Sequence, residues 1–217
     1  MNWVLDFDDT LAVGANTWAL TRIIPDIAST HHLPLDPVEF TRISLHAQKL
    51  SNETSDDLAL LDEMFRQLGW PTKFKHELLN RMFQEYVPAL YDDTLPFLQR
   101  LSVAAHRIIL MSNNDHAPTI AAQLDIDHYF AAILTPKRCE NAGGKPKRDM
   151  WDFAVAQGIV EASVPTQMVG DDPWSEGTLA DVCGHSCWIV DRLDRYGALH
   201  ADLAYQWVSS LFDIPTK

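Results

Sequence analysis

Three acidic side chains lie close together near the start of the chain: Asp6, Asp8 and Asp9. They end a segment, residues 3–7, that is apolar apart from Asp6, too short for a helix and rich in strand-favouring residues. In open α/β sheets, ligands bind at the carboxyl ends of such buried strands. On a regular strand, Asp6 and Asp8 would point to the same side. Two close carboxylates raise each other's pKa unless a cation lies between them, and oxygen ligands of this kind suit Mg²⁺.

Further polar groups stand where other strands or loops are predicted to end. Ser112 and the pair Asp171–Asp172 each follow an apolar segment, and Lys145 lies in a basic, glycine-bearing loop. Carboxylates together with a hydroxyl and an ammonium are the groups used for phosphoryl transfer through an aspartyl-phosphate. For the first acidic segment alone, a polar turn after a strand is the alternative, because Asp-Asp-Thr is common turn chemistry.

Composition limits the classes of function. The chain has 217 residues, of which 47% are hydrophobic, enough for a substantial core. A formal net charge of −13 argues against nucleic acid or an anionic membrane as the partner. The three cysteines form neither a disulfide framework nor a zinc motif. No apolar stretch reaches membrane-spanning length, and the first residues are acidic where a signal peptide is basic, so we expect a cytoplasmic protein.

Residues 15–87 show a helical pattern and no predicted strand. Asp36 is predicted to cap one helix, and Ser55 and Thr72 to cap two later ones. The last of these helices would turn four apolar side chains inward: Phe74, Leu78, Met82 and Phe83. An all-helical block directly after a strand indicates an insertion.

Strands alternate with helices in the rest of the chain. Strands are predicted at residues 107–111, 129–134, 167–169, 187–190 and 205–208, and helices begin near residues 93, 118, 146 and 175. This alternation implies parallel crossovers, so the expected fold class is α/β with a doubly wound, mainly parallel sheet. Residues 1–14 and 88–217 would form the catalytic core, and residues 15–87 an inserted α-helical cap.

Four segments resemble, in order and spacing, the four motifs of the haloacid dehalogenase-like (HAD) hydrolase superfamily. They are residues 5–11, 109–113, 144–146 and 169–172. One such motif alone is weak, but four in order are strong. The resemblance covers the whole chain, and the helical block stands where that family inserts a cap. It implies a Rossmann-like core and a Mg²⁺-dependent phosphatase acting on a small phosphorylated metabolite.

The resemblance also implies roles for the acids. Asp6 would be the nucleophile that attacks phosphorus. Asp8 would protonate the leaving oxygen and then activate water. Asp6, the backbone carbonyl of Asp8, and Asp171 would hold Mg²⁺, with Asp172 replacing or assisting Asp171.

Ser112, Asn113 and Lys145 would bind the phosphoryl oxygens, and Lys145 would also reduce the repulsion between the two reacting anions. Two positions depart from the family pattern. Asp9 stands where a small residue is frequent, and Glu176 stands where a further Asp commonly follows. Because Glu is one methylene longer, we expect it to reach the metal only through water or to contact a lysine.

Other functions remain compatible with these residues. A phosphomutase or phosphotransferase of the same superfamily needs the same two acids of the first motif and differs in how its cap closes. A metal-binding scaffold without turnover is a further alternative. A signalling receiver module groups its acids before the hydroxyl and has no helical insertion, so its order of residues does not match.

Overall fold

The computed structural model describes residues 1–54 and 57–216. The chain divides into two compact units. One consists of Met1–Val13 and Ala89–Lys217, and the other of Gly14–Pro88. We refer to them as the α/β unit and the helical unit.

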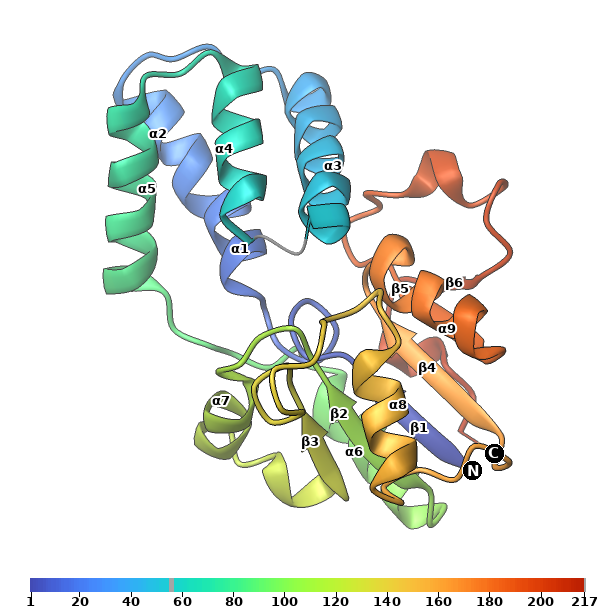
Figure 1. Ribbon diagram of the computed structural model, residues 1–217. Helices are drawn as coiled ribbons and strands as arrows, with labels where there is room; N and C mark the ends of the chain where they lie inside the picture. The colour runs from blue at the N-terminus through green and yellow to red at the C-terminus, as the bar shows by residue number, and fades with distance from the viewer. Residues whose placement is uncertain (55–56, 217) are drawn as a thin grey trace. The chain divides into compact units, whose positions relative to one another are not determined.

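Within the described residues, the α/β unit contains one sheet of six parallel strands in the order β3-β2-β1-β4-β5-β6 (Figure 1). The strands are β1 (Asn2–Leu5), β2 (Arg107–Met111), β3 (Ala132–Leu134), β4 (Thr166–Gly170), β5 (Ser186–Val190) and β6 (Gln206–Val208). Leu5 at the end of β1 lies opposite Leu110 of β2 and Val169 of β4. The residues that follow these three strands therefore meet at one edge of the sheet. The predicted fold class is confirmed.

Helices cover both faces of the sheet, so β1 is buried on both sides. Trp3 and Leu5 pack in one core with α6 (Thr94–Val103) and α7 (Ala117–Gln123), whereas Val4 packs in the other with α8 (Asp149–Ala156) and α9 (Thr178–Cys183). In Figure 1, α8 lies in front of the sheet and α6 behind it. Alternate residues of a strand point to opposite faces, so an uninterrupted apolar strand is what this layered arrangement requires.

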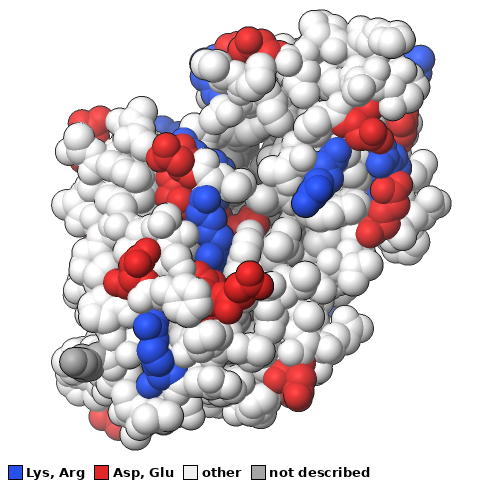
Figure 2. Space-filling model, turned by 180° about the vertical axis from the view of Figure 1, so that it is seen from behind, with Lys and Arg blue, Asp and Glu red and all other residues white. Residues whose placement is uncertain are grey.

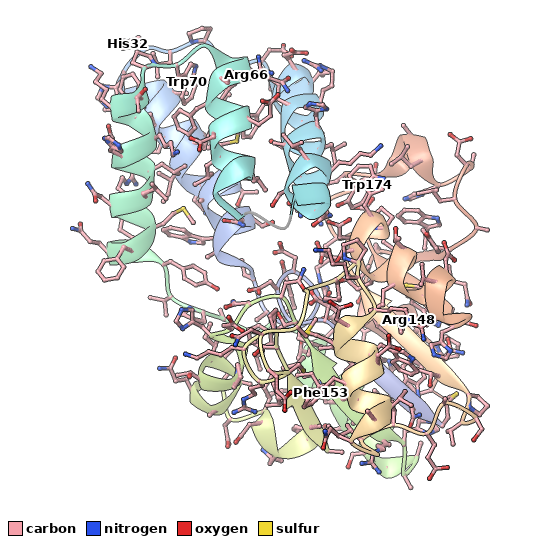
Figure 3. The ribbon with its side chains drawn as sticks, viewed as in Figure 1. His32, Arg66, Trp70, Arg148, Phe153 and Trp174 are labelled. Atoms are coloured by element: carbon pink, nitrogen blue, oxygen red, sulfur yellow. The ribbon has the colours of Figure 1, made fainter. Side chains whose placement is uncertain are left out.

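The helical unit has its own hydrophobic core. Its elements are α1 (Ala15–Trp18), a π-helical turn (Ala19–Ile23), α2 (Ile24–Thr30), α3 (Pro37–Thr54), α4 (Asp57–Leu68) and α5 (Thr72–Glu85). Trp70 lies between α4 and α5 (Figure 3). Its ring packs edge-on against Phe65 and Phe74 at centroid distances of 6.0 and 6.4 Å. None of the described helices is long and apolar enough to cross a membrane.

The predicted helix caps have different outcomes. Asp36 caps α3 as predicted, because its Oδ1 accepts a hydrogen bond from the backbone N–H of Glu39 at 2.8 Å. Thr72 is instead the first residue inside α5, and Pro71 occupies the cap position without a side-chain hydrogen bond. The predicted cap Ser55 lies outside the described residues.

The prediction for the inward face of α5 was wrong at one position. Phe74 and Leu78 are buried and Met82 packs against the same core, but the side chain of Phe83 is 92% exposed. Successive residues of a helix are rotated by about 100° around its axis. Phe83 is therefore rotated away from Met82, which lies one turn beyond Leu78 and packs against the core.

In the α/β unit, β3 and α8 begin later than predicted, and the helix predicted near residue 175 starts as a π-helical turn at Pro173 that leads into α9. β3 starts at Ala132, because residues 127–129 form a 3₁₀ turn. α8 starts at Asp149, because the N–H of Lys147 bonds to the carbonyl of Gly144 at 3.0 Å and closes a turn. Lys145 therefore lies in a loop and not at the first turn of a helix.

Charged side chains of both signs are interspersed on the face shown in Figure 2. Many charged side chains at the surface form ion pairs. Arg81 contacts Asp26 at 2.6 Å and Glu85 at 2.8 Å, and Arg148 contacts Asp152 at 2.8 Å. Exposed pairs of this kind contribute at most about 1 kcal/mol each. The stability of both units therefore comes mainly from their apolar cores.

Candidate active site

Asp6 is the first residue after β1 and carries a buried carboxylate. Its backbone N–H donates to the carbonyl of Val169 at 2.8 Å, which extends the pairing of β1 with β4 by one residue. The loop then turns through Asp9, whose φ of 58° is in the left-handed region, where Asp is one of the better tolerated residues. Tyr91 donates from its hydroxyl to Asp9 Oδ1 at 3.3 Å. Asp9 thus makes the turn, which explains an acid at this position.

Lys145 is the cation of the site and is only 4% exposed. Its ammonium donates to Asp6 Oδ1 and lies 2.6 Å from Glu176 Oε1. Burial alone would lower the pKa of Lys145, but the attraction of the two carboxylates outweighs it and raises this pKa. The Lys145 side chain therefore stays charged, as a buried ammonium in contact with two carboxyl groups should.

Asn113 holds the lysine loop in place. Its Nδ2 donates to the carbonyl of Lys145 at 2.9 Å, and its Oδ1 accepts from the N–H of Lys145 at 2.7 Å. A Cβ on Gly144 would lie 2.7 Å from Asn113 Oδ1, so glycine is needed for this close approach. The Asn113 side chain was predicted to bind substrate. In the structure both ends of its amide are engaged by the Lys145 backbone.

Three carboxylates converge next to this lysine. Asp6, Asp171 after β4, and Glu176 each offer one oxygen within 4.8 Å of the others. Asp172, predicted as a possible metal ligand, is not in this group. Its Oδ1 accepts from the N–H of Trp174 at 2.8 Å and caps the π-helical turn at residues 173–177. The prediction could not separate the two neighbouring acids, because a cap and a ligand need the same residue type.

Glu176 reaches the lysine from this π-helical turn. Its Oε2 accepts from the N–H of Asp172 at 3.2 Å, and its Oε1 accepts from the hydroxyl of Ser175 at 3.0 Å. Both oxygens are therefore engaged, and Oε1 also faces Lys145. Of the two expectations for Glu176, contact with a lysine is the one that the geometry matches.

Gly170, the last residue of β4, leaves the room through which the Glu176 side chain passes. A Cβ at this position would overlap the Cγ of Glu176. We expect Gly170→Ala to displace Glu176 from Lys145 and to lower the free energy of unfolding by about 2 kcal/mol, as overpacking does. Chemical denaturation measures this. In a Glu176→Ala background the same substitution should cost much less, and equal costs in both backgrounds would contradict the steric explanation.

Burial makes the Asp6 carboxylate difficult to ionise. It raises the pKa of Asp6 to about 8, with further contributions from Glu176 and Asp8, while Lys145 acts in the opposite direction. One ammonium is therefore too little positive charge for this cluster, and additional positive charge would favour the ionised carboxylate.

The Asp171 carboxylate is also difficult to ionise. Its pKa is raised well above the usual range by burial and by the nearby Asp9, Glu176 and Asp6, although Arg195 lowers it. An oxygen-only set of donors with unbalanced negative charge fits a hard divalent cation such as Mg²⁺. Asp6 and Asp171 would hold it, with the backbone carbonyl of Asp8.

Asn114 is a site residue that the sequence did not reveal. Its Nδ2 donates to Asp8 Oδ2 at 3.0 Å, and its backbone N–H donates to Ser112 Oγ at 3.1 Å. Ser112 is buried directly after β2. Asn114 thus links Ser112 of the second predicted motif to Asp8 of the first. Its type is common in turns, so only the spatial contact identifies it.

Arg192 connects the loop after the first motif to Asp93. Its guanidinium forms two hydrogen bonds of 2.8 Å to the Asp93 carboxylate and a third of 2.8 Å to the carbonyl of Thr10. Asp93 Oδ2 also accepts from the hydroxyl of Ser210 at 2.6 Å and from the N–H of Leu211 at 2.8 Å. This network fixes the loop after the first motif against segments from the other end of the chain.

Comparisons with known proteins identify the family of this chain. A model of the haloacid dehalogenase-like hydrolase family matches residues 3–180. No curated protein matches the sequence significantly. Because the family model covers most of the chain, the protein belongs to the haloacid dehalogenase-like hydrolases, as the sequence motifs predicted.

Solved structures share the fold. A HAD family hydrolase from Deinococcus radiodurans R1, with bound phosphate and sodium, is 17% identical, has a TM-score of 0.73 and is matched over 98% of this chain and 92% of that one. YfnB from Bacillus subtilis, described as a HAD-hydrolase and bound to magnesium, is 12% identical, with a TM-score of 0.68 and coverage of 98% and 95%. A HAD phosphatase from Thermococcus onnurineus is 17% identical, with a TM-score of 0.59 and coverage of 98% and 94%.

Proposed function

We propose that this hydrolase is a Mg²⁺-dependent phosphatase that hydrolyses a small phosphomonoester through an aspartyl-phosphate on Asp6. The observation that carries the proposal is the buried contact of the Lys145 ammonium with Asp6 Oδ1 and Glu176, next to the carboxylate of Asp171. A purely structural ion pair would not require a third acid, Asp171, whose negative charge makes the ionised Asp6 less favourable.

Asp6 attacks in the first half of the reaction. One carboxylate oxygen forms a bond to phosphorus while the bond from phosphorus to the leaving oxygen breaks. Lys145 reduces the repulsion between the Asp6 carboxylate and the phosphoryl group. Ser112 lies at the end of the neighbouring strand, where its hydroxyl and the following backbone N–H groups would bind phosphoryl oxygens as charge develops on them.

Asp8 serves in both halves of the reaction. It donates a proton to the leaving oxygen, then takes a proton from the water that attacks the acyl phosphate, so that Asp6 and inorganic phosphate are released. The amide of Asn114, which donates to Asp8 Oδ2 at 3.0 Å, would hold the carboxyl group in orientation through both steps.

Asp6 and Asp171, with the Asp8 carbonyl, would hold Mg²⁺. When bound, the ion supplies positive charge that favours the ionised Asp6 and neutralises charge on the transferred group. In this scheme Glu176 is not a ligand but keeps Lys145 charged and in position. Asp172 stays outside the metal shell as the cap of the turn that carries Glu176.

We assign the helical unit, residues 14–88, the role of a cap that selects the organic part of the substrate and restricts water. The hydrophobic core of this unit, independent of the sheet, is consistent with a separately folded insertion. A phosphomutase would use the same catalytic residues and differ in cap closure.

Removal of divalent metal tests the proposal. We expect the purified protein to hydrolyse para-nitrophenyl phosphate in the presence of Mg²⁺ and to lose at least about 100-fold in rate with a chelator, because several kcal/mol of charge stabilisation disappear. Excess Mg²⁺ should restore the rate. Full hydrolysis in the chelator would contradict the metal dependence, and absence of phosphate release from any phosphomonoester would contradict the phosphatase assignment.

A further inference from the structure

An arginine outside the four motifs contacts the carboxylate of Asp171. Arg195, in the loop after β5, donates from Nη2 to Asp171 Oδ2 at 2.7 Å. The side chains are only 21% and 14% exposed, respectively, so water screens this pair less than an exposed one. Lys145 contacts the other acids of the cluster, whereas Arg195 contacts Asp171 alone among the described members Asp6, Asp171 and Glu176.

The loop holds Arg195 in a fixed place. Its backbone N–H and that of Tyr196 donate to the buried carboxylate of Asp191, each at 2.8 Å. The Arg195 guanidinium lies 5.1 Å from the centre of the Tyr196 ring, and that ring packs edge-on against Trp174 at 5.5 Å. Trp174 projects from the turn after β4 (Figure 3). Arg195 is therefore built into the site and is not a surface side chain that meets Asp171 by chance.

We propose that Arg195 is a positioning residue that restricts Asp171 to coordination through one oxygen and thereby favours Mg²⁺ over Ca²⁺. The inference rests on the metal site of the proposed function. Because the guanidinium binds Oδ2, a cation that took both oxygens of Asp171 would have to displace it. Ca²⁺ has six to eight ligands and frequently takes carboxylates through both oxygens, whereas Mg²⁺ requires a compact octahedron.

A role in selectivity differs from a role as a positive charge alone. A positive charge near the site weakens the binding of every divalent cation by a similar factor. Restriction to one oxygen weakens Ca²⁺ binding more than Mg²⁺ binding. The ratio of the two dissociation constants therefore separates the two roles, and neither affinity alone does so.

The test is direct metal binding to the full chain, without substrate. Dissociation constants for Mg²⁺ and Ca²⁺ are measured by isothermal titration calorimetry and checked by the metal-dependent shift of the melting temperature. The variants are Arg195→Gln and Arg195→Lys, which keeps the charge. Arg148→Gln is the control, because Arg148, at the N-cap of α8, pairs with Asp152 in an exposed position. The melting temperature without metal confirms that each variant is folded.

We expect Arg195→Gln to bring the Ca²⁺ dissociation constant closer to that of Mg²⁺, changing their ratio by about fivefold or more, because both oxygens of Asp171 become available. Arg195→Lys and Arg148→Gln should keep the wild-type ratio. If Arg195→Gln strengthens or weakens both metals equally, the selectivity role is wrong while the metal site stands. If the wild-type protein shows no saturable response to Mg²⁺, both this role and the proposed metal site are wrong.

Discussion

Replacing Asp6 by asparagine is expected to reduce the hydrolysis of an aryl phosphate by at least about a thousandfold, because an amide cannot form the acyl-phosphate bond. Asparagine has nearly the shape of the carboxyl group and leaves Lys145 its second partner, Glu176. The loss should therefore appear in kcat. Steady-state kinetics with Mg²⁺ and rapid quenching to trap phosphorylated protein measure it, and the variant should show no trapped phosphate.

The control for this substitution is the folded state. We expect the melting temperature of Asp6→Asn without Mg²⁺ to stay within about 3 °C of the wild type, a difference near 1 kcal/mol for a protein of this size. An inactive but folded variant supports the role of the nucleophile. A folded variant with activity within tenfold of the wild type would show that another group attacks phosphorus.

Replacing Lys145 by methionine should have the largest combined effect on stability and activity. The ammonium is buried between Asp6 and Glu176, so its removal leaves two carboxylates without a counter-charge. Removing one partner of a buried ionic group typically costs about 3 kcal/mol or more. Activity should fall by at least about 100-fold, because the cation no longer stabilises charge at the reacting centre. Denaturation and kinetics measure the two effects.

A second substitution separates these two effects. In Lys145→Met combined with Glu176→Gln, one of the unpaired charges is neutral, so part of the lost stability should return while the activity stays low. Lys137→Met is the matched control, because Lys137 is an exposed lysine of the same loop region. If the double variant recovered activity together with stability, Lys145 would be a structural residue only.

The sequence predicted the elements whose residues are buried on all sides. β2 was predicted with its observed bounds, residues 107–111, because a short apolar run of strand-favouring residues is typical of a buried strand. Predictions were less accurate where the start of an element or the orientation of a side chain depends on contacts with other parts of the chain. Phe83 was assigned to the core by its residue type, although the rotation from Met82 turns it outward. α8 starts at Asp149 and not near residue 146 as predicted, because a pattern of apolar spacing does not reveal the turn at residues 144–147.

The site was predictable only in part, for a similar reason. The motifs located the residues that carry charge, and the structure brings Asp6, Lys145 and Asp171 together. The residues that hold them, such as Asn114 and Arg195, have types that occur in any turn or surface loop. Their roles depend on distances between segments far apart in the chain, and no local pattern contains that information.

The central place of β1 in the sheet also bears on how the protein is made. Its neighbours β2 and β4 begin at residues 107 and 166, so β1 and the Asp6 that follows it are synthesised long before either of them. Such distant pairings are slow to form and come late in folding. On the ribosome, the acidic loop therefore remains without Lys145 and Asp171 until most of the chain has emerged, and the residues of the proposed site come together only after that.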